Sequence, residues 1–455
     1  TGAESRLFAI DAASGKEIWV FDPDEDCDNR GLNFWQAGKD KRILYVAGSN
    51  LYAVDAITGK LVEDFGTDGR VDFYLGLEHD RFDVRNFNIT STSPGVIYRD
   101  VLVIGSTVSE YGDALPGDIR GFDVRTGELR WVFHTIPQPG EPGYETWPED
   151  AWQHIGGANA WGGFTLDKER GWVFCGTGSA AYDHWGGNRL GQNLYANCIL
   201  TLNANTGERI WHFHAVHHDI WDYDLPCPPN LVKVNGVDAV AQPTKMGHLF
   251  ILDRQTGQPL FPVEERVTPP STIPGEESWP TQPFPPEGLR YAQQRFTSQE
   301  VTDLNPEATE MVKTRLLQMD VGDLFLPPSI KGAVTLPQFN GGTDWGGAAY
   351  NPQTGVLYVN ASNEAEWISM VETDTSAAIS LFDFGHQLYR AVCSNCHGYN
   401  EAKNPGAPSL VGLRQIGAEG KDRLHRALID GKGMMPKFAT LSADERKALV
   451  AYIQE

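Results

Sequence analysis

One short pattern recurs five times in this chain of 455 residues and constrains its fold more than any other feature. An alternating apolar run is followed by Asp or Asn, two further residues, Ser or Thr, then Gly and a second run with aromatic residues. The five turns begin at Asp11, Asp55, Asp123, Asn203 and Asp253. Each run is typical of a half-buried strand, the Asp or Asn side chain caps its own turn, and Gly supplies a positive φ. The pattern predicts repeated β-hairpins.

The spacing of these turns indicates how the hairpins are grouped. Successive turns lie 44, 68, 80 and 50 residues apart, which fits four-stranded propeller blades joined by loops of varying length. Weaker hairpins precede several of them in TSPGVIYRDVLVIGS, AWGGFTLDKERGWVFCGTGS and DWGGAAYNPQTGVLYVNAS. We predict an all-β propeller over residues 1–370, in preference to a β-sandwich with coincidental turns. The blade that begins at Trp345 receives no second hairpin, so we expect further blades to close the ring.

The sequence changes character after Val371. SAAISLFDFGHQLYRAVCSNCHGYN has helical periodicity, and the final segment opens with Ser442 and Glu445 at the spacing of a capping box. The apolar residues on one face of that last helix are Leu449, Val450 and Ile453. Residues 377–455 carry 10 basic and 8 acidic side chains, whereas the whole chain carries 37 and 60. We predict a small all-α domain over 377–455, joined to an acidic propeller.

The helical region contains a strong cofactor motif. Cys393, Cys396 and His397 form Cys-x-x-Cys-His, whose thiols reach the two vinyl groups of a heme while the His lies on the iron axis. GKGMMPKF follows and offers a thioether just before a proline. The region resembles a class I cytochrome c domain, which favours Met435 over Met434 as the second ligand of the iron. It implies a covalent heme c and a location outside the cytoplasm, in the periplasm for a bacterial protein.

The net charge of −23 bounds the partners of the chain. So acidic a protein is poorly suited to nucleic acid or to an anionic membrane surface. No uninterrupted apolar run is long enough to span a bilayer, and no signal peptide is recognisable. Because the chain begins inside a strand-like pattern, we expect an N-terminal portion to have been removed. Membrane association of the full-length protein stays open.

The stretch HAVHHDIWDYDLPCPP, from His214 to Pro229, concentrates ionisable and aromatic residues on a loop. Together with PTKMGHLFILDR it resembles the pyrroloquinoline quinone (PQQ) dehydrogenases. It is closest to the membrane glucose dehydrogenase-like branch and is similar to the quinohemoprotein alcohol dehydrogenases. Several motifs follow the family's order over residues 1–370. The resemblance implies an eight-bladed quinoprotein propeller, incomplete in this chain, and a dehydrogenase that oxidises an alcohol, polyol or sugar hydroxyl and passes electrons to heme.

The resemblance implies five contacts with the quinone. Arg30, in DNRG, matches an Arg that pairs with a quinone carboxylate, and a guanidinium fork suits a tricarboxylate ligand. GANAWGG contains Asn159 and Trp161, and the Trp forms the floor under the planar quinone. TKMG places Lys245 against the quinone oxygens, where it would stabilise developing charge. VNAS places Asn360 at a late position that contacts the cofactor.

The resemblance also implies a metal ion and a general base. Glu110, in GSTVSEYG, is the leading oxygen ligand for Ca²⁺ or Mg²⁺, which polarises the quinone carbonyl. Ser179, in GTGSAAYD, stands where the family usually has an Asn or a Thr-type ligand. Asp222 matches the base that removes the hydroxyl proton while hydride moves to the quinone, and it is also a candidate metal ligand. Asp219 is a nearby second carboxylate that stays a candidate for the base.

Two other functions remain open at the level of sequence. A non-enzymatic propeller scaffold with an electron-relay cytochrome would not gather the predicted cofactor residues in one axial pocket. A metal-dependent hydrolase or lyase propeller would need a His-rich centre, for which His217, His218 and Asp222 are the candidates. We favour structural roles for the two histidines.

Expected partners are a small-molecule alcohol or sugar and a downstream electron acceptor, which is a cytochrome, a copper protein or the respiratory chain. We expect the Pro-rich segment VTPPSTIPGEESWPTQPFPPEG to shape the mouth of the pocket. The substrate, the choice between Ca²⁺ and Mg²⁺, the oligomeric state and the pairing of Cys27, Cys175, Cys198 and Cys227 stay unassigned.

Overall fold

The computed structural model describes residues 5–454 apart from residues 24, 26, 28, 29, 78–82, 112, 113, 373–378, 399–407, 412, 414–416, 432–434, 436, 437, 439 and 440, and apart from the side chains of residues 395, 396 and 417–419. The chain divides into two compact units. The first comprises Thr1–Phe82 and Ile89–Ser369, and the second comprises Asp83–Asn88 and Met370–Glu455. We call them the sheet unit and the helical unit.

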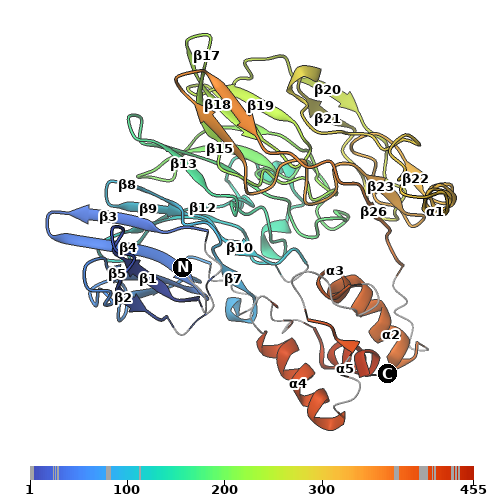
Figure 1. Cartoon of the computed structure of the whole chain (residues 1–455), viewed down its shortest axis with the longest axis horizontal. Coiled ribbons are helices and arrows are strands. Elements are labelled where there is room, and N and C mark those ends of the chain that lie inside the picture. Colours follow the sequence, from blue (N-terminus) through green and yellow to red (C-terminus); the bar gives the residue numbers. More distant parts are fainter. Residues whose placement is uncertain are drawn as a thin grey trace. The chain divides into compact units, whose positions relative to one another are not determined.

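The sheet unit consists of small sheets that follow one another along the chain (Figure 1). Three of its antiparallel sheets have four strands each. They are formed by β3 (Asn33–Ala37), β4 (Asp40–Ala47), β5 (Asn50–Asp55) and β6 (Arg70–Asp72); by β8 (Val96–Tyr98), β9 (Val101–Ile104), β11 (Ile119–Asp123) and β12 (Leu129–Phe133); and by β13 (Phe164–Asp167), β14 (Trp172–Gly176), β15 (Cys198–Asn203) and β16 (Arg209–His214).

The remaining sheets are smaller. Three strands each are found in the sheet of β17 (Asn230–Val234), β18 (Val237–Pro243) and β19 (Leu249–Asp253) and in that of β22 (Asp320–Val321), β23 (Ala333–Thr335) and β26 (Glu366–Ile368). Two-stranded pairs are β1 (Leu7–Ile10) with β2 (Glu17–Phe21), β7 (Ile89–Thr90) with β10 (Thr107–Val108), β20 (Glu264–Val267) with β21 (Thr281–Phe284), and β24 (Ala348–Asn351) with β25 (Val356–Val359). The three weaker hairpins of the sequence are β8–β9, β13–β14 and β24–β25, as predicted.

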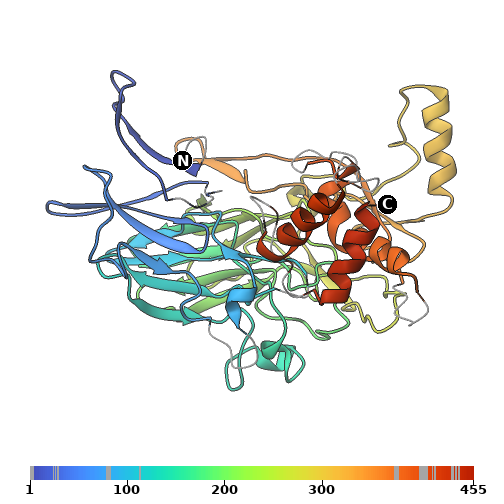
Figure 2. The same ribbon diagram turned by 90° about the horizontal axis from the view of Figure 1, so that it is seen from below.

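Short helices interrupt the sheet unit. Single 3₁₀ turns are η3 (Tyr144–Thr146), η4 (Ala151–Gln153) and η5 (Glu287–Leu289). The α-helix α1 (Pro306–Leu316) begins after Asn305, whose side chain caps it by accepting from Ala308 N, and it buries none of its residues. Figure 2 shows that α1 stands away from the sheets.

The five repeated turns have the predicted hydrogen bonds. In each, the side-chain oxygen of Asp or Asn accepts from the backbone N–H of the Ser or Thr three residues on, at 2.7–3.3 Å. The turns that follow Asp55 and Asp253 depart from the pattern in one respect. In each, the second run forms only a single antiparallel bridge with the first, between Val54 and Leu61 and between Leu252 and Pro259.

Tryptophans link consecutive sheets of this unit. Trp19 Nε1 donates to the carbonyl of Ala56 at 3.3 Å, and Trp211 Nε1 donates to that of Arg254 at 3.0 Å. A Cβ atom on the turn glycine of the receiving hairpin would lie only 2.4–2.6 Å from the indole ring. These pairs are Trp19 with Gly59, Trp131 with Gly207, and Trp211 with Gly257. The glycine therefore serves both the positive φ of its own turn and the packing of the preceding sheet.

Among the residues that the structure describes, the named elements of the helical unit are the 3₁₀ turn η2 (Val84–Asn86) and five further helical elements. They are α2 (Leu381–Leu388), the π-helical η6 (Tyr389–Cys393), α3 (Ser394–His397), α4 (Gly417–Asp430) and α5 (Ala443–Gln454). Helices α2 and α5 approach closely, since a Cβ atom at Gly385 would lie 1.9 Å from the carbonyl oxygen of Ala448. The core contains Tyr389, Cys393, Leu410, Leu424, Leu428, Phe438, Leu449, Val450, Tyr452 and Ile453.

The predicted capping box at the start of α5 is confirmed. Ser442 N donates to Glu445 Oε2 at 2.6 Å, and Glu445 N donates to Ser442 Oγ at 3.2 Å. The three apolar residues predicted on one face of this helix are all buried. In the part of the chain that the structure describes, no helix combines the length and the apolar surface needed to cross a bilayer.

Candidate active site

The loop after β16 carries the residues predicted to be catalytic, and its backbone has an uncommon shape. His218 has a φ of 46° and Asp222 a φ of 58°, both in the left-handed region that residues other than glycine seldom adopt. Asp219 stabilises this path, because its carboxylate accepts from Trp221 N at 2.9 Å and from Tyr223 N at 2.7 Å. The loop therefore holds Asp222 in a defined position.

Asp219 is also bonded from outside the loop. Its Oδ2 accepts from Asn197 Nδ2 at 2.8 Å and from the hydroxyl of Ser179. Arg189 Nη2 donates to its carbonyl oxygen at 2.6 Å. The sequence left Asp219 as a second candidate for the general base, whereas the structure commits both carboxylate oxygens to holding the loop.

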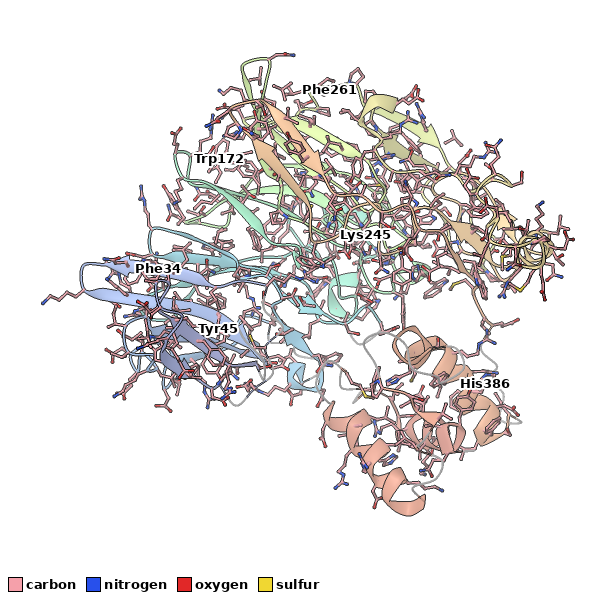
Figure 3. The ribbon with its side chains drawn as sticks, viewed as in Figure 1. Phe34, Tyr45, Trp172, Lys245, Phe261 and His386 are labelled. Atoms are coloured by element: carbon pink, nitrogen blue, oxygen red, sulfur yellow. The ribbon has the colours of Figure 1, made fainter. Side chains whose placement is uncertain are left out.

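Lys245 lies beside Asp222 in the interior of the sheet unit (Figure 3). It follows β18, and its Nζ lies 2.8 Å from Asp222 Oδ1 and 3.2 Å from Asp224 Oδ2. The three side chains are only 7–10% exposed. Desolvation opposes the lysine charge, but the two carboxylates outweigh it and raise the pKa of Lys245. A charged lysine is thus held between two carboxylates.

Trp161 lies next to this ion pair. Its Nε1 donates to Asp224 Oδ2 at 2.8 Å, and Lys245 Nζ lies 5.8 Å from the centroid of its ring. Arg30 Cζ lies 5.2 Å from the Trp161 ring and 5.1 Å from the Trp345 ring. The structure therefore brings together a planar aromatic ring, an ammonium group and a guanidinium group, which the sequence predicted for the quinone.

Glu110 and Asp183 bring further negative charge near Lys245. Glu110 is an exposed residue, yet desolvation of its carboxyl among the neighbouring groups is the largest cause that raises its pKa, and Lys245 acts in the opposite direction. Burial also raises the pKa of Asp183 and of Asp222 well above its ordinary value, and neighbouring carboxylates add to the shift in both. Together with Asp224, four carboxylates interact with one lysine, and bound protons or a cation must offset the excess.

The predicted metal ligands are only partly assembled. Across the described ranges, no group of three or more His, Cys, Asp or Glu side chains is arranged to hold a metal ion. Asp222 is paired with Lys245, and the Ser179 hydroxyl donates to Asp219 and lies 3.0 Å from Asp224 Oδ1. The hard oxygen donors and their excess negative charge nevertheless suit Ca²⁺ or Mg²⁺. The metal site stays a prediction.

The two asparagines predicted to contact the quinone lie in different surroundings. Asn159 precedes Trp161 by two residues, and its Nδ2 donates to the carbonyl of Ser106 at 2.9 Å. Asn360 is exposed, and a Cβ atom on Gly346 would lie 3.5 Å from its Nδ2. Asn360 therefore lies beside the residue that follows Trp345, at the Arg30 end of the group.

Sequence reasoning missed two carboxylates of this site. Asp224 bonds Trp161, faces Lys245 and accepts from Ser179 N at 2.7 Å, so it joins three of the predicted residues. Asp183 is buried and is influenced electrostatically by Asp222. The density of acids in DIWDYD was the available signal for Asp224, whereas nothing in the spacing of GSAAYDHW singled out Asp183.

The cysteines of the sheet unit do not form a disulfide among Cys175, Cys198 and Cys227, which carry buried thiols. Burial raises the pKa of the Cys175 and Cys198 thiols, as expected of inert core residues. Cys27 is also buried, with its Sγ 3.5 Å from the carbonyl of Val46.

The heme residues of the helical unit lie around its core. His397 ends α3, is 7% exposed, and its Nδ1 lies 2.9 Å from the carbonyl oxygen of Pro408. A carbonyl only accepts, so Nδ1 carries the proton and Nε2 is left to bind iron. Cys393 is buried and Met435 packs against the same core. The side chain of Cys396 and the whole of Met434 lie outside the described residues.

Comparison with known families identifies both units. A family model described as "Glucose/ethanol/alcohol dehydrogenase, beta-propeller domain", with the short name PQQ, matches residues 1–389. A second model, "Cytochrome C oxidase, cbb3-type, subunit III", matches residues 381–453. The boundary predicted between residues 370 and 377 stays a prediction.

Curated relatives include two quinone-linked enzymes. The quinoprotein glucose dehydrogenase of Escherichia coli (strain K12) is 33% identical over 387 residues, which cover 79% of this chain and 47% of the relative. The quinate/shikimate dehydrogenase (quinone) of Acinetobacter baylyi is 30% identical over 407 residues, covering 81% and 49%. The chain thus spans about half the length of the curated relatives it matches.

A solved structure supports the fold. The quinohemoprotein alcohol dehydrogenase ADHIIG from Pseudomonas putida HK5 superposes with a TM-score of 0.65 and 18% identity, covering 100% of this chain and 86% of that one. Together with the family matches, this similarity confirms the predicted fold class: a quinoprotein-type β-propeller and a small all-α cytochrome c domain.

Proposed function

The chain belongs to the family of PQQ-dependent glucose, ethanol and alcohol dehydrogenases, and from that premise we propose that it oxidises a hydroxyl of an alcohol, polyol or sugar and delivers the electrons through heme c to an external acceptor. The acceptor is a cytochrome, a copper protein or the respiratory chain. The observation that carries the proposal is the buried pair of Lys245 and Asp222 beside Trp161. We also propose a periplasmic location, because Cys-x-x-Cys-His implies covalent heme attachment outside the cytoplasm.

The residues around Trp161 fit a planar, anionic cofactor. Its ring offers a stacking surface, and Arg30 and Lys245 both lie within 6 Å of the ring centroid. These two cations would pair with the carboxylates and ring oxygens of the quinone. When bound, PQQ accepts hydride from the carbon that bears the hydroxyl, and heme c takes up electrons one at a time.

Asp222 is the general base in this proposal. Its carboxylate would take the hydroxyl proton as hydride leaves the neighbouring carbon, so that the alcohol becomes a carbonyl compound. Burial raises the pKa of Asp222, which makes its carboxylate a stronger proton acceptor, and Lys245 opposes the shift and favours the ionised form. The strained loop and the salt bridge together orient Oδ1 and Oδ2 before the substrate arrives.

Glu110, Asp222 and Ser179 would hold a divalent cation with oxygen ligands. Their fit rests on charge, because four carboxylates interact with one lysine. A bound Ca²⁺ or Mg²⁺ would act as a Lewis acid on the quinone. Asp224, which the sequence did not suggest, is a further oxygen donor in the same group.

His397 and Met435 would bind the iron of heme c, and Cys393 and Cys396 would attach the porphyrin. The bond from His397 Nδ1 to Pro408 leaves Nε2 as the nitrogen available to the metal. The buried core beside Cys393 and Met435 excludes water from that side.

Charge balance favours an uncharged substrate. Lys245, Arg30 and a divalent cation would together balance the carboxylates of Glu110, Asp183, Asp222 and Asp224, and an anionic quinone would then leave the site negative. A hydroxy acid of the quinate kind would therefore be repelled, whereas polyols and aldoses would not. We propose a neutral polyol, alcohol or aldose as the substrate.

An absorbance titration tests the function. The full-length, heme-loaded protein is mixed with PQQ and Ca²⁺, then with alcohols, polyols, aldoses and quinate, and the reduced heme bands are recorded. We expect reduction that requires quinone, metal and one class of neutral substrate. In Asp222→Asn the rate should fall by about 10²–10⁴-fold, with quinone binding, measured by quenching of Trp fluorescence, retained.

The turn variant Asp253→Asn serves as the matched control, because Asn203 fills the equivalent place in another repeat. It should reduce heme at the wild-type rate. Heme that responds to dithionite but to no substrate, in protein that does not bind PQQ, would contradict the proposal and favour the non-enzymatic scaffold.

A further inference from the structure

His218 stands at a meeting point of three segments behind the catalytic loop. Its side chain is fully buried, and its Nε2 lies 2.7 Å from Oε1 of Glu276, whose side chain is 2% exposed. Its Nδ1 lies 3.0 Å from the carbonyl oxygen of Gly191. Oε2 of Glu276 accepts from Gly186 N. The loop of Asp222, the segment 186–191 and the Pro-rich segment that contains Glu276 are therefore joined through one imidazole and one carboxylate.

The hydrogen-bond partners determine where the protons lie. A backbone carbonyl oxygen and a carboxylate oxygen are both acceptors, and a neutral imidazole has only one N–H to offer. Both contacts are hydrogen bonds only if both ring nitrogens donate. A proton on Glu276 is disfavoured for reasons independent of His218, because Glu276 Oε2 already accepts from Gly186 N and the positive charge of Arg189 also favours the carboxylate.

We infer that His218 is a doubly protonated positioning residue whose pairing with Glu276 fixes the loop that carries Asp222. The catalytic consequence rests on the proposed function, whereas the protonation state does not. The hydrogen bonds of His218 join it to Glu276, Gly191 and Gln192 rather than to Asp222 or Lys245, so it acts through the backbone of the loop.

The backbone of this part of the loop shows why it needs an additional contact, which we call the latch: the ion pair of His218 with Glu276. His218 and Asp222 both have positive φ, which a loop keeps only when its neighbours hold it. Asp219 and Arg189 secure the middle of the loop, and His218 N donates to the carbonyl of Gln192 at 3.1 Å. The pair of His218 and Glu276 secures its beginning.

Glycine at position 186 makes the close approach feasible. A Cβ atom there would lie 2.6 Å from His218 Nε2 and 3.1 Å from Arg189 Nη1. The charged groups that face the pair are therefore Arg189 on one side and the carboxylates of Asp219 and Asp183, which interact with Arg189. Two cations and three carboxylates are packed together, so a neutral His218 would leave Glu276 without its principal counter-charge.

Nitrogen NMR of the full-length, heme-loaded protein labelled with ¹⁵N-histidine tests the inference. An imidazolium gives two similar ring-nitrogen shifts, each coupled to a proton, whereas a neutral ring gives two widely separated shifts. Near neutral pH we expect one imidazolium pattern that disappears in His218→Gln. In Glu276→Gln it should be replaced by the neutral pattern, and kcat for substrate-dependent heme reduction should fall about tenfold or more with KM little changed.

Glu277→Gln is the matched control, since Glu277 is the exposed neighbour of Glu276. It should keep the imidazolium pattern and the wild-type kcat. If Glu276→Gln does not fold, neutron diffraction of wild-type crystals decides the question, because it shows directly whether both ring nitrogens carry deuterium.

The outcomes separate the two proposals. A neutral His218 in the wild type overturns the latch even if the protein is a dehydrogenase. An imidazolium in protein that oxidises no substrate leaves the latch intact and sinks the proposed function instead. An imidazolium together with unchanged kcat in a folded Glu276→Gln variant shows that His218 does not position the loop.

Discussion

Aspartate serves opposite purposes in the hairpin turns and in the loop between residues 217 and 224. In the turns, Asp11 is fully exposed and its pKa is lowered by the hydroxyl and the backbone N–H of Ser14. At Asp55 burial favours a higher pKa, but the hydrogen bonds from Thr58 outweigh burial, and the pKa is lowered. In the loop, burial prevails and raises the pKa of Asp219 and of Asp222.

The comparison teaches that hydrogen bonds alone do not set the charge of a carboxyl group. Asp219 accepts from two backbone N–H groups, from the Ser179 hydroxyl and from Asn197, and its pKa is still raised. These are more donors than the repeated-turn residues Asp11 and Asp55 have. Desolvation and nearby like charges decide the direction. A turn carboxylate therefore stabilises its own backbone with little desolvation cost. The buried loop carboxylates instead need Lys245 to offset their charge, and each raises the pKa of its neighbours.

Of the substitutions that test this comparison, removal of the Lys245 ammonium group should cause the largest loss in the free energy of unfolding. Lys245→Met leaves Asp222 and Asp224 buried without their partner, and breaking a buried pair costs about 3–5 kcal/mol. Urea unfolding followed by Trp fluorescence measures this cost, since all 13 Trp residues lie at or before Trp367. The loss should shrink at acid pH, where protons can neutralise the carboxylates.

Lys233→Met is the matched control for that variant. Lys233 pairs with Asp238 at 2.8 Å but is 62% exposed, so its loss should cost no more than about 1 kcal/mol. Equal costs for the two lysine variants would contradict the view that burial distinguishes the two kinds of carboxylate.

Asp118 offers a buried carboxyl away from the catalytic loop. Burial, opposed by His134 and by the N–H of Thr135, raises its pKa from 3.8 to about 6. The folded state then binds the proton more tightly than the unfolded state, so the free energy of unfolding falls as pH rises from about 4 to about 6. Asp118→Asn removes this loss and should be more stable than the wild type above pH 6, by up to about 3 kcal/mol.

The pH dependence can be checked by urea unfolding between about pH 5 and pH 7. Asp238→Asn is the reference, because Lys233 and Arg170 lower the pKa of Asp238 to about 2 and its contribution is constant over that range. A difference between wild type and Asp118→Asn that does not grow with pH would show that Asp118 is not buried in its charged form.

Asp219→Asn distinguishes a structural aspartate from a catalytic one. An amide keeps one acceptor oxygen but turns an NH₂ group toward N–H and O–H donors, which should cost about 1–3 kcal/mol. We expect stability and substrate-dependent heme reduction to fall together. Loss of activity with wild-type stability would instead return Asp219 to its place as a candidate base.

The smallest effect is expected in a turn. Asp253→Ala removes the bonds to the N–H groups of Gln255 and Thr256 and should cost about 1 kcal/mol, as loss of a cap does elsewhere. Asp253→Asn should recover most of it. Thermal unfolding of the two variants side by side measures the difference, and a larger cost than for Asp219→Asn would reverse the comparison.

The repeated elements of the fold could be predicted because their causes are local. The Asp-to-Thr bonds, the turn glycines, the hairpins and the capping box of Ser442 and Glu445 each depend on residues a few positions apart. The meeting of Arg30, Trp161, Asp222 and Lys245 was predicted through family motifs, and the structure places these side chains close together, while their roles stay predictions.

The rest depended on contacts between distant segments. The family resemblance favoured Asp222 over Asp219 and did not single out Asp224. The residues themselves could not separate the three, because the partners that distinguish them, such as Asn197, Lys245 and Trp161, come from distant segments. Ser179 was predicted as a metal ligand, but its hydroxyl is engaged with Asp219, a partner 40 residues away. The pairing of His218 with Glu276 spans 58 residues and has no local signature.

The packing of an indole over the turn glycine of the next hairpin has a consequence for how such repeats evolve. Trp19 with Gly59, Trp131 with Gly207 and Trp211 with Gly257 each divide one contact between two neighbouring repeats. A mutation at either position changes the selection on the other, so the two should covary among descendants of this sequence. A repeat that is duplicated or transplanted alone would present a Trp without its glycine at one end and a glycine without its Trp at the other. Only an insertion that supplies both partners would be tolerated.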